Sequence, residues 1–329
     1  MVDAPFSPPG LEEEGPLPKP LLGYALVAGA VALWSVNAVV AKVVIESGGL
    51  SPERLSEVRA TGAGLLMAAA LAVLRPGSLR FLRPREWLFL AAFGICGLAF
   101  VQFLYFAAIE RLDIGTALVI EYIAPVLVAA WARFVGRERM RRRLWAALAL
   151  SLGGLALVVE LPTGVTLSGL GVAAALGGAV AYAFYVLMAD RSLKDGRDAT
   201  SLLALGFLFA ALFWAAVQPW WSFPGGIVGR DASLLGRLAG TSAPVSLLLA
   251  FVVVLGTIVP FIMIVTALHH LSPTRVIIVA MLEPVLASVA AFAWLGEELS
   301  GQQIAGGLLV LAAVALAQTA RTRAETVSR

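Results

Sequence analysis

The sequence predicts an all-α membrane protein with ten transmembrane helices, arranged as two inverted five-helix repeats. Three observations support this fold class: the composition, the length of the apolar runs, and a similarity between the two halves of the chain. Of the 329 residues, 60% are hydrophobic and only 14% are charged, whereas a soluble domain carries roughly 25% charged residues. Lipid is therefore the expected solvent, and in lipid a helix satisfies its own backbone hydrogen bonds.

Ten runs have the length of about 20 apolar residues that a helix needs to cross a bilayer. The expected spans are residues 21–45, 53–74, 87–109, 114–134, 143–160, 168–189, 199–218, 246–269, 273–295 and 302–320. Most connectors are short. The exception, residues 219–245, contains Trp220 and Trp221, which suit a membrane interface. This segment is interpreted either as a lid or as an interfacial loop.

The expected domains follow from these spans. Residues 21–160 form the first five-helix repeat and residues 168–320 the second, inverted repeat. Residues 1–20 are rich in proline and acidic side chains and lack the basic start and cleavage site of a signal peptide, so they are expected to form a disordered cytoplasmic tail. Residues 321–329 form a second cytoplasmic tail.

The basic residues predict the orientation of the chain. Most of the 24 Lys and Arg residues fall in alternate connectors and tails, including the run RERMRRR at 137–143, whereas the opposite connectors hold Arg111, Arg230 and Arg237, with Arg54 at a span edge. By the positive-inside rule, both termini are cytoplasmic and the protein is an integral plasma (inner) membrane protein. The run at 137–143 is then a topology anchor, and no nucleic-acid partner is expected.

The second half of the sequence repeats features of the first. GAVA at 29–32 recurs at 178–181, and PVL at 125–127 recurs at 284–286. The spacing of 159 residues between the two PVL motifs also relates Gly97 to Gly256. Because each half holds an odd number of spans, the second half enters the membrane from the opposite side, as in secondary transporters whose binding site lies near mid-membrane. The alternative is a chance match between apolar segments.

Two glutamates lie deep within predicted spans, Glu121 in the fourth and Glu283 in the ninth. At ~1.5 Å per residue, both are more than ~10 Å below the surface. An ionised side chain at that depth costs roughly 2.5–3.5 kcal/mol, so it is expected to face a polar cavity or a partner. Both are candidate substrate-binding residues and, because burial favours the neutral form of a carboxyl group, candidate proton carriers. The alternative is a purely structural hydrogen bond or ion pair.

Candidate hinge or gate residues surround the glutamates. Pro125 and Pro284 remove backbone hydrogen bonds and bend their helices, which either shapes a pocket or is a tolerated kink. Lys42 and Arg59 are either gate residues or structural ions. Lys42 also lies four residues before Glu46, a spacing that permits an ion pair on one helix face.

Other candidate substrate contacts are polar or aromatic side chains in the middle of spans. They are Trp34, Asn37, Gln102, Tyr105, Tyr122, Tyr182 and Tyr185. The amides of Asn37 and Gln102 suit hydrogen bonds either to a ligand or between helices. The tyrosines either line a cavity or pack in the core.

The sequence offers no enzyme chemistry. The two histidines, His269 and His270, are adjacent, so they cannot ligate a metal from one helix face as residues four apart do. There is no P-loop for ATP, and the single cysteine, Cys96, excludes an internal disulfide. We therefore expect neither an enzyme nor a bound cofactor or metal.

Several stretches give the sequence a family resemblance. LWSVNAVVAK (33–42), the arginine of EVRA (57–60) and LEPVLASVAAFAWLGEELS (282–300) closely resemble the EamA branch of the drug/metabolite transporter superfamily. IGTALVIEYIAPV (114–126) and TRVIIVAMLEPVLA (274–287) look particularly like the bacterial threonine/homoserine exporter subgroup.

The resemblance covers about residues 21–320 and implies a ten-helix inverted-repeat fold, a central cavity lined by both halves and efflux of small metabolites such as amino acids. By match to the family, Glu121 and Glu283 correspond to glutamates of the exporter subgroup, and Lys42 and Arg59 to the family's lysine and arginine. The first half departs from the pattern: FVGRER (134–139) stands where the second half has WLGEEL, so strict equivalence of the repeats is not expected there.

The function that the sequence favours is a secondary active exporter of amino acids or similar small polar metabolites, working by alternating access, with proton coupling as a further hypothesis. One alternative is a transporter of drugs, nucleotide sugars or sugar phosphates. Phosphorylated substrates favour several basic residues in the cavity, and only Lys42 and Arg59 are expected near it. An intramembrane enzyme or a scaffold is the other alternative. The expected partners are a small-molecule substrate and membrane lipid.

Overall fold

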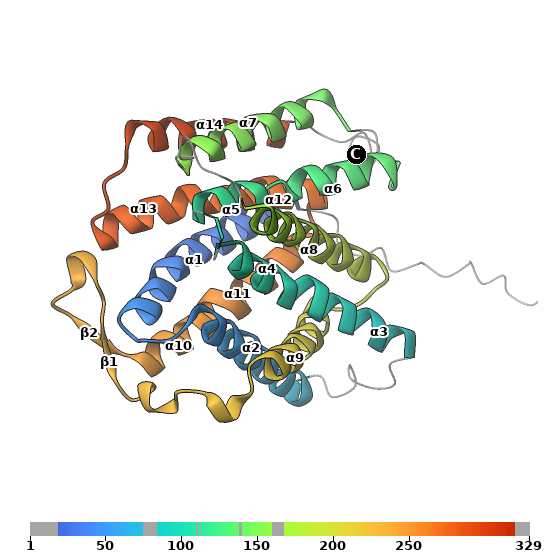
Figure 1. Ribbon diagram of the computed structural model, residues 1–329. Coiled ribbons are helices and arrows are strands. Elements are labelled where there is room, and N and C mark those ends of the chain that lie inside the picture. The colour runs from blue at the N-terminus through green and yellow to red at the C-terminus, as the bar shows by residue number, and fades with distance from the viewer. Residues whose placement is uncertain are drawn as a thin grey trace, which may run out of the picture.

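The computed structural model describes residues 19–74, 84–109, 111–112, 114–137, 140–159 and 168–319. Within them the chain forms ten consecutive helical segments, four of which are interrupted (Figure 1). The uninterrupted segments are α1 (Pro20–Glu46), α2 (Pro52–Leu74), α7 (Arg142–Val158), α8 (Gly169–Lys194), α9 (Ala199–Val217) and α14 (Gly301–Thr319). The interrupted segments are α3–η2–α4 (Pro84–Ala92, Phe93–Ala99, Phe100–Ile109), α5–α6 (Ile114–Glu121, Ala124–Phe134), α10–η6–α11 (Val245–Val253, Val254–Ile258, Val259–Ala267) and α12–α13 (Pro273–Ala280, Glu283–Leu295).

The helices confirm the all-α membrane class. Seven of them are long and apolar enough to cross a bilayer, among the residues that the structure describes. The predicted spans 114–134, 143–160 and 302–320 are helical but shorter or interrupted: α7 has 17 residues, and the apolar part of α14 is Gly301–Ala317. Residues 1–18 and 321–329, the expected tails, lie outside the described residues, as does Glu160.

The first pair of interruptions consists of π-helical turns. η2 contains Gly97 and η6 contains Gly256, the two glycines that the 159-residue spacing relates. Each glycine lies against a helix of the other half: Gly97 contacts Tyr185 on α8, and Gly256 contacts Asn37 on α1. A side chain at either glycine would push these helices apart, so the glycines permit the two crossings.

The second pair of interruptions lies at the prolines. The helix is broken at Tyr122–Ile123 and at Met281–Leu282, and Pro125 and Pro284 occupy the first turn of the helix that follows each break. Proline lacks the N–H that would continue the hydrogen-bond ladder, and its fixed φ suits a new helix start. The prediction that these prolines disrupt their helices is therefore confirmed.

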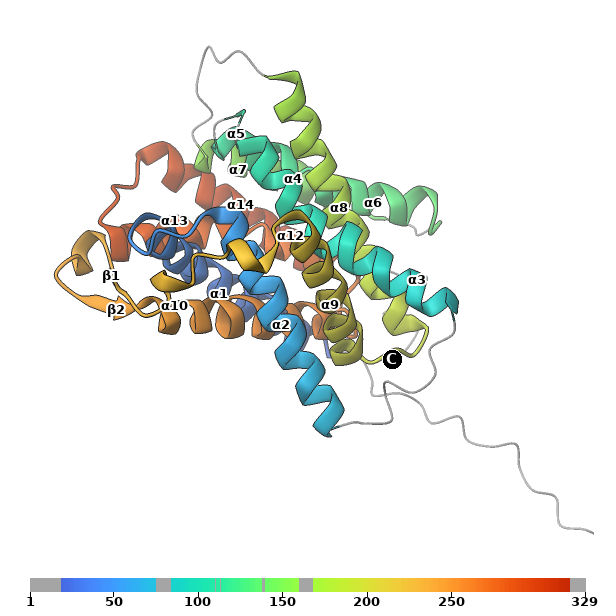
Figure 2. The ribbon, with the colours of Figure 1, turned by 60° about the horizontal axis from the view of Figure 1, so that its bottom comes forward.

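Corresponding helices of the two halves pack on each other. α2 lies along α9, and α7 lies along α14 (Figures 1 and 2). α1 packs on α11 and α13 of the second half, just as α8 packs on α4, α5 and α6 of the first half. The core of the molecule is thus built from contacts between the halves.

The segment 219–245 contains a small sheet that the sequence analysis did not predict. β1 (Asp231–Ser233) pairs antiparallel with β2 (Ser242–Pro244). The connector also has three 3₁₀ turns, η3 (Trp220–Ser222), η4 (Gly225–Ile227) and η5 (Gly236–Leu238). Strands of three residues are too short for the alternation that identifies a strand in a sequence.

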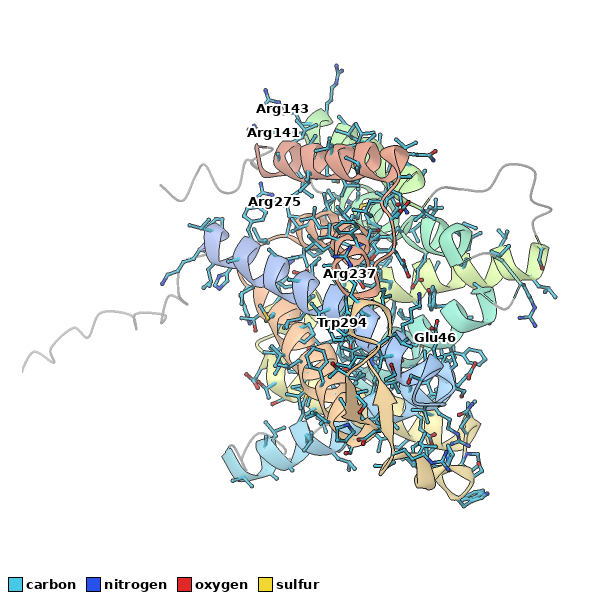
Figure 3. The ribbon with its side chains drawn as sticks, turned by 90° about the vertical axis from the view of Figure 1, so that its left-hand side faces the viewer. Glu46, Arg141, Arg143, Arg237, Arg275 and Trp294 are labelled. Atoms are coloured by element: carbon cyan, nitrogen blue, oxygen red, sulfur yellow. The ribbon has the colours of Figure 1, made fainter. Side chains whose placement is uncertain are left out.

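The hairpin holds the end of α13. Trp294 Nε1 donates a 2.8 Å hydrogen bond to the carbonyl oxygen of Leu234. The Arg237 guanidinium lies over the Phe292 ring, 5.0 Å from its centroid. Figure 3 shows Arg237 and Trp294 together where the hairpin meets this helix.

Glycines bring α7 and α14 into close contact. A Cβ atom on Gly154 would lie 2.7 Å from the carbonyl oxygen of Gly306 and 2.9 Å from the backbone nitrogen of Val310. Small residues let helix backbones approach closely, which is a main source of helix association in lipid. Backbone atoms cannot rotate away as a flexible side chain can, so this contact tolerates only glycine.

We expect Gly154→Ala to lower the thermal stability of the protein. Overpacking at a close contact typically costs about 1–3 kcal/mol. The neighbouring Gly153→Ala is the matched control, because nothing lies within 4 Å of a Cβ at that position and alanine is the better helix former. Melting of both variants in detergent checks this; equal melting temperatures would contradict the account of the contact.

Candidate functional site

The two broken helices present one glutamate each, on opposite sides of equivalent breaks. Glu121 is the last residue of α5, before its break, whereas Glu283 is the first residue of α13, after its break. At the 159-residue spacing, Glu121 corresponds to Ala280 and Glu283 to Ala124. The site is therefore asymmetric although the two halves are alike.

Glu283 is tied to both halves of the molecule. Its Oε2 accepts a 3.1 Å hydrogen bond from the hydroxyl of Tyr122, which lies in the break of the first half. Its backbone oxygen accepts a 3.2 Å hydrogen bond from Ser35 Oγ on α1. The carboxylate also interacts electrostatically with Arg59.

Arg59 on α2 supplies the positive charge of the site. Its Nε donates a 3.0 Å hydrogen bond to Thr257 Oγ1, and Thr257 donates a 2.8 Å hydrogen bond to the carbonyl oxygen of Val252. Thr257 lies in the π-helical turn η6, so this turn positions the guanidinium. Arg59 makes no direct ion pair with a carboxylate among the described residues, which leaves its Nη groups as donors.

Glu121 is buried against α8. Its carboxyl carbon would lie 3.7 Å from a Cβ on Gly178, so the glycine makes room for it. It interacts electrostatically with Glu283 and with Tyr105 on α4. The structure thus brings together both predicted glutamates with Tyr105, Tyr122 and Arg59.

Aromatic side chains border this group. Tyr182 stacks on Tyr185, with ring centroids 6.2 Å apart, and Tyr182 interacts electrostatically with both glutamates. Phe261 on α11 meets Trp34 edge to face at 5.4 Å and Tyr185 at 5.6 Å. Tyr182 is thus near the carboxylates, whereas Trp34 and Tyr185 belong to the packed aromatic cluster beside them.

The predicted amides differ in their positions. Asn37 is buried at the contact with Gly256, and its Oδ1 has no hydrogen-bond partner among the described residues. Gln102 lies half-buried on α4 and forms no hydrogen bond to a described residue. Asn37 contacts Gly256, and Gly256 precedes Thr257, which binds Arg59. Of the two amides, Asn37 is therefore the one beside the residues that hold Arg59.

Lys42 lies away from the glutamates and pairs with an unexpected partner. Its Nζ lies 2.8 Å from Oε1 of Glu297, which follows the end of α13. The helical spacing also permits an ion pair with Glu46, but the structure pairs Lys42 with Glu297. The ion pair joins α1 to the residues that follow α13, two segments that only the fold brings together. Lys42 is therefore at the hairpin end of the molecule and not in the group around Glu283.

Three further residues belong to this region. Ser35, Thr257 and Phe261 are not among the candidates that the sequence indicates. Thr257 adjoins Gly256, whose correspondence to Gly97 is the one signal that the sequence contained. Phe261 resembles any other apolar span residue, and its contacts become visible only in the fold.

The arrangement combines two carboxylates with one guanidinium in a buried setting. Such a group suits a small ligand that carries both a cation and an anion. Among the described residues, no group of three or more His, Cys, Asp or Glu side chains is placed to hold a metal ion.

Comparison with known proteins identifies relatives of this chain. The family described as the EamA-like transporter family matches twice, over residues 21–160 and 169–319. The uncharacterized inner membrane transporter YicL of Salmonella typhimurium is 25% identical over 297 residues, which cover 89% of this chain and 94% of that protein.

Two further relatives have a named activity. The threonine/homoserine exporter RhtA of Salmonella typhimurium is 30% identical over 247 residues, covering 74% of this chain and 75% of that protein. RhtA of Escherichia coli is 29% identical over 256 residues, covering 76% and 78%. A protein of known crystal structure has the same fold, with a TM-score of 0.74 over 92% of this chain and 99% of that one; at 18% identity the likeness shows the fold alone.

Proposed function

Because the chain belongs to the EamA-like transporter family, and is thus a membrane transporter and not an enzyme, we propose that it exports amino acids or similar small polar metabolites by alternating access. The observation that carries this proposal is the group formed by Glu283, Tyr122 and Arg59 at the junction of the two halves. An amino acid carries an ammonium and a carboxylate, which Glu283 and Arg59 complement. The 30% identity to a threonine/homoserine exporter supports the same substrate class.

The proposed orientation has both termini in the cytoplasm of a cell bounded by the plasma (inner) membrane. The distribution of basic residues supports it. With five crossings in each half, the second half runs opposite to the first, so one fold offers two states of similar energy that open to opposite sides. The breaks before Pro125 and Pro284 are the proposed hinges between these states.

The charges near the site favour a zwitterion over a phosphorylated substrate. Phosphate groups favour several bases, as in clusters of arginine and lysine. Among the described residues, Arg59 is the base that interacts with Glu283, and Lys42 is engaged with Glu297. A sugar phosphate would also face the two nearby carboxylates, which repel it.

The experiment that tests the function is efflux from proteoliposomes containing the purified full-length protein. We expect saturable efflux of radiolabelled threonine, and competition by unlabelled threonine and homoserine but not by glucose 6-phosphate. Empty liposomes give the background. Efflux at the background rate for both amino acids, or stronger competition by the sugar phosphate, would refute the proposed substrate class.

We propose that protons drive the export and that Glu121 carries them. Glu283 accepts a hydrogen bond from Tyr122, whereas Glu121 is buried and forms no hydrogen bond to a described residue. Glu121→Gln, which cannot release a proton, is expected to abolish the stimulation of efflux by an imposed pH gradient. The exposed Glu298→Gln is the control; undiminished stimulation in Glu121→Gln would assign the proton to another group.

A further inference from the structure

A cleft lies at the hairpin end of the molecule, between α1, α7, α13 and the start of α14. Its volume is about 330 Å³. Most of its lining is apolar, as at Ala291, but Lys42, Ser288, Glu297 and Gln303 also line it. Apolar walls with a few converging polar groups, in a volume of roughly 300–1,000 Å³, are typical of sites for small ligands.

The cleft follows α13 away from Glu283. Pro284, the next residue of α13, lines its inner end, and Glu297 lines its outer end. At about 1.5 Å per residue, α13 is about 18 Å long from Glu283 to Leu295, and Glu297 lies beyond that end. One amino acid cannot span that distance, so a ligand in the outer part of the cleft occupies a place of its own.

The charged pair of the cleft is suited to exchange its partners. Lys42 Nζ and Glu297 Oε1 are 2.8 Å apart, and their side chains are 41% and 52% exposed. A pair this exposed contributes at most about 1 kcal/mol, so separating it costs little. A zwitterion that enters between them offers its carboxylate to Lys42 and its ammonium to Glu297, and two charged contacts replace one.

Gln303 supplies a fixed polar group beside this pair. Its Oε1 accepts a 3.1 Å hydrogen bond from the Ser300 backbone N–H, and its own N–H donates a 3.1 Å hydrogen bond to Ser300 Oγ. This reciprocal pattern is a capping box, which fixes the start of α14. The side-chain NH₂ group is not used by the cap and remains a donor for a ligand carboxylate.

We propose that the cleft is a second, outer binding site for the exported zwitterion, in which Lys42 and Glu297 exchange their mutual ion pair for the two charges of the substrate. The inference rests on the proposed function for its substrate class. It adds a stage to the export path: the substrate leaves Glu283 and Arg59, moves along α13 and pauses between Lys42 and Glu297.

The test counts bound substrate. Equilibrium binding of radiolabelled threonine to the full-length protein in nanodiscs is expected to give two molecules per chain. The double variant Lys42→Met with Glu297→Gln removes both charges together, so neither is left unpaired, and is expected to bind one. Glu283→Gln is also expected to bind one. The control, Arg191→Met with Asp195→Asn, removes another exposed pair and is expected to bind two.

Other outcomes overturn the inference. One threonine per wild-type chain, or two in the Lys42 and Glu297 double variant, would show that the cleft is not a threonine site. A phospholipid that fills the cleft would give the first of these results. Failure of the proposed function would give a different result. If the protein does not export threonine, the wild type would show no saturable threonine efflux and no threonine binding at either site.

A labelling experiment locates the outer site independently. In a Cys96→Ala background, Ala291→Cys places one thiol in the cleft. Threonine at ten times its Kd is expected to slow the reaction of this thiol with a maleimide about tenfold, in proportion to occupancy. The protection is expected to persist when Glu283→Gln is added. A labelling rate that threonine leaves unchanged would overturn the proposal.

Discussion

Glu283→Gln is expected to lower threonine efflux by about a hundredfold or more. The substitution keeps the size of the side chain and an oxygen that can accept from Tyr122, but it removes the charge that faces Arg59 and the substrate ammonium. Losing one member of a buried charged pair typically costs about 2–5 kcal/mol, and each 1.4 kcal/mol is tenfold. Initial efflux rates from proteoliposomes measure the loss.

Glu298→Gln is the matched control for this variant. It makes the same chemical change on the same side of the break, but at an exposed residue, and it is expected to leave efflux unchanged. Melting of Glu283→Gln in detergent checks that the variant is folded. Glu283→Gln efflux within threefold of the wild type would remove Glu283 from the site.

Arg59→Met is expected to have an effect of similar size. Arg59 is fixed at Nε by Thr257 and leaves its remaining N–H groups for a carboxylate. Without it, the substrate carboxylate would be buried beside two glutamates with no compensating charge, at a cost of about 2–5 kcal/mol. Arg59→Lys keeps the charge but loses the forked geometry, so we expect it to raise the KM for threonine with a smaller change in kcat.

Arg191→Met is the control for Arg59, because its side chain is 72% exposed. Arg59→Lys separates recognition from packing: a structural role would lower the melting temperature of both variants and leave the KM unchanged. That result would contradict the assignment of Arg59 to the substrate carboxylate.

The sequence was sufficient to predict the main features that position the site. Charged residues deep in apolar runs and prolines beside them identified Glu121, Glu283 and both helix breaks, because lipid makes buried charge and broken helices costly and therefore rare. The spacing of 159 residues also related Gly97 to Gly256, where the structure has equivalent π-helical turns. These features depend on residue type and local position, which a sequence contains.

The features that the sequence did not predict depend on contacts between distant residues. Lys42 pairs with Glu297 rather than with its helical neighbour Glu46, and Trp294 bonds to the hairpin. Thr257 holds Arg59 across two helices of different halves. Such partners are chosen by the packing of the halves, so no spacing within one helix indicates them.

Recognition of both charges of an amino acid by the proposed site is tested most directly by competition with analogues. Threonine counterflow into wild-type proteoliposomes would be measured against threoninol, which lacks the carboxylate, and N-acetylthreonine, which lacks the ammonium. We expect neither analogue to compete at concentrations where homoserine competes fully. Equal competition by either analogue would contradict the account, because one of the two charges would then be unnecessary for binding.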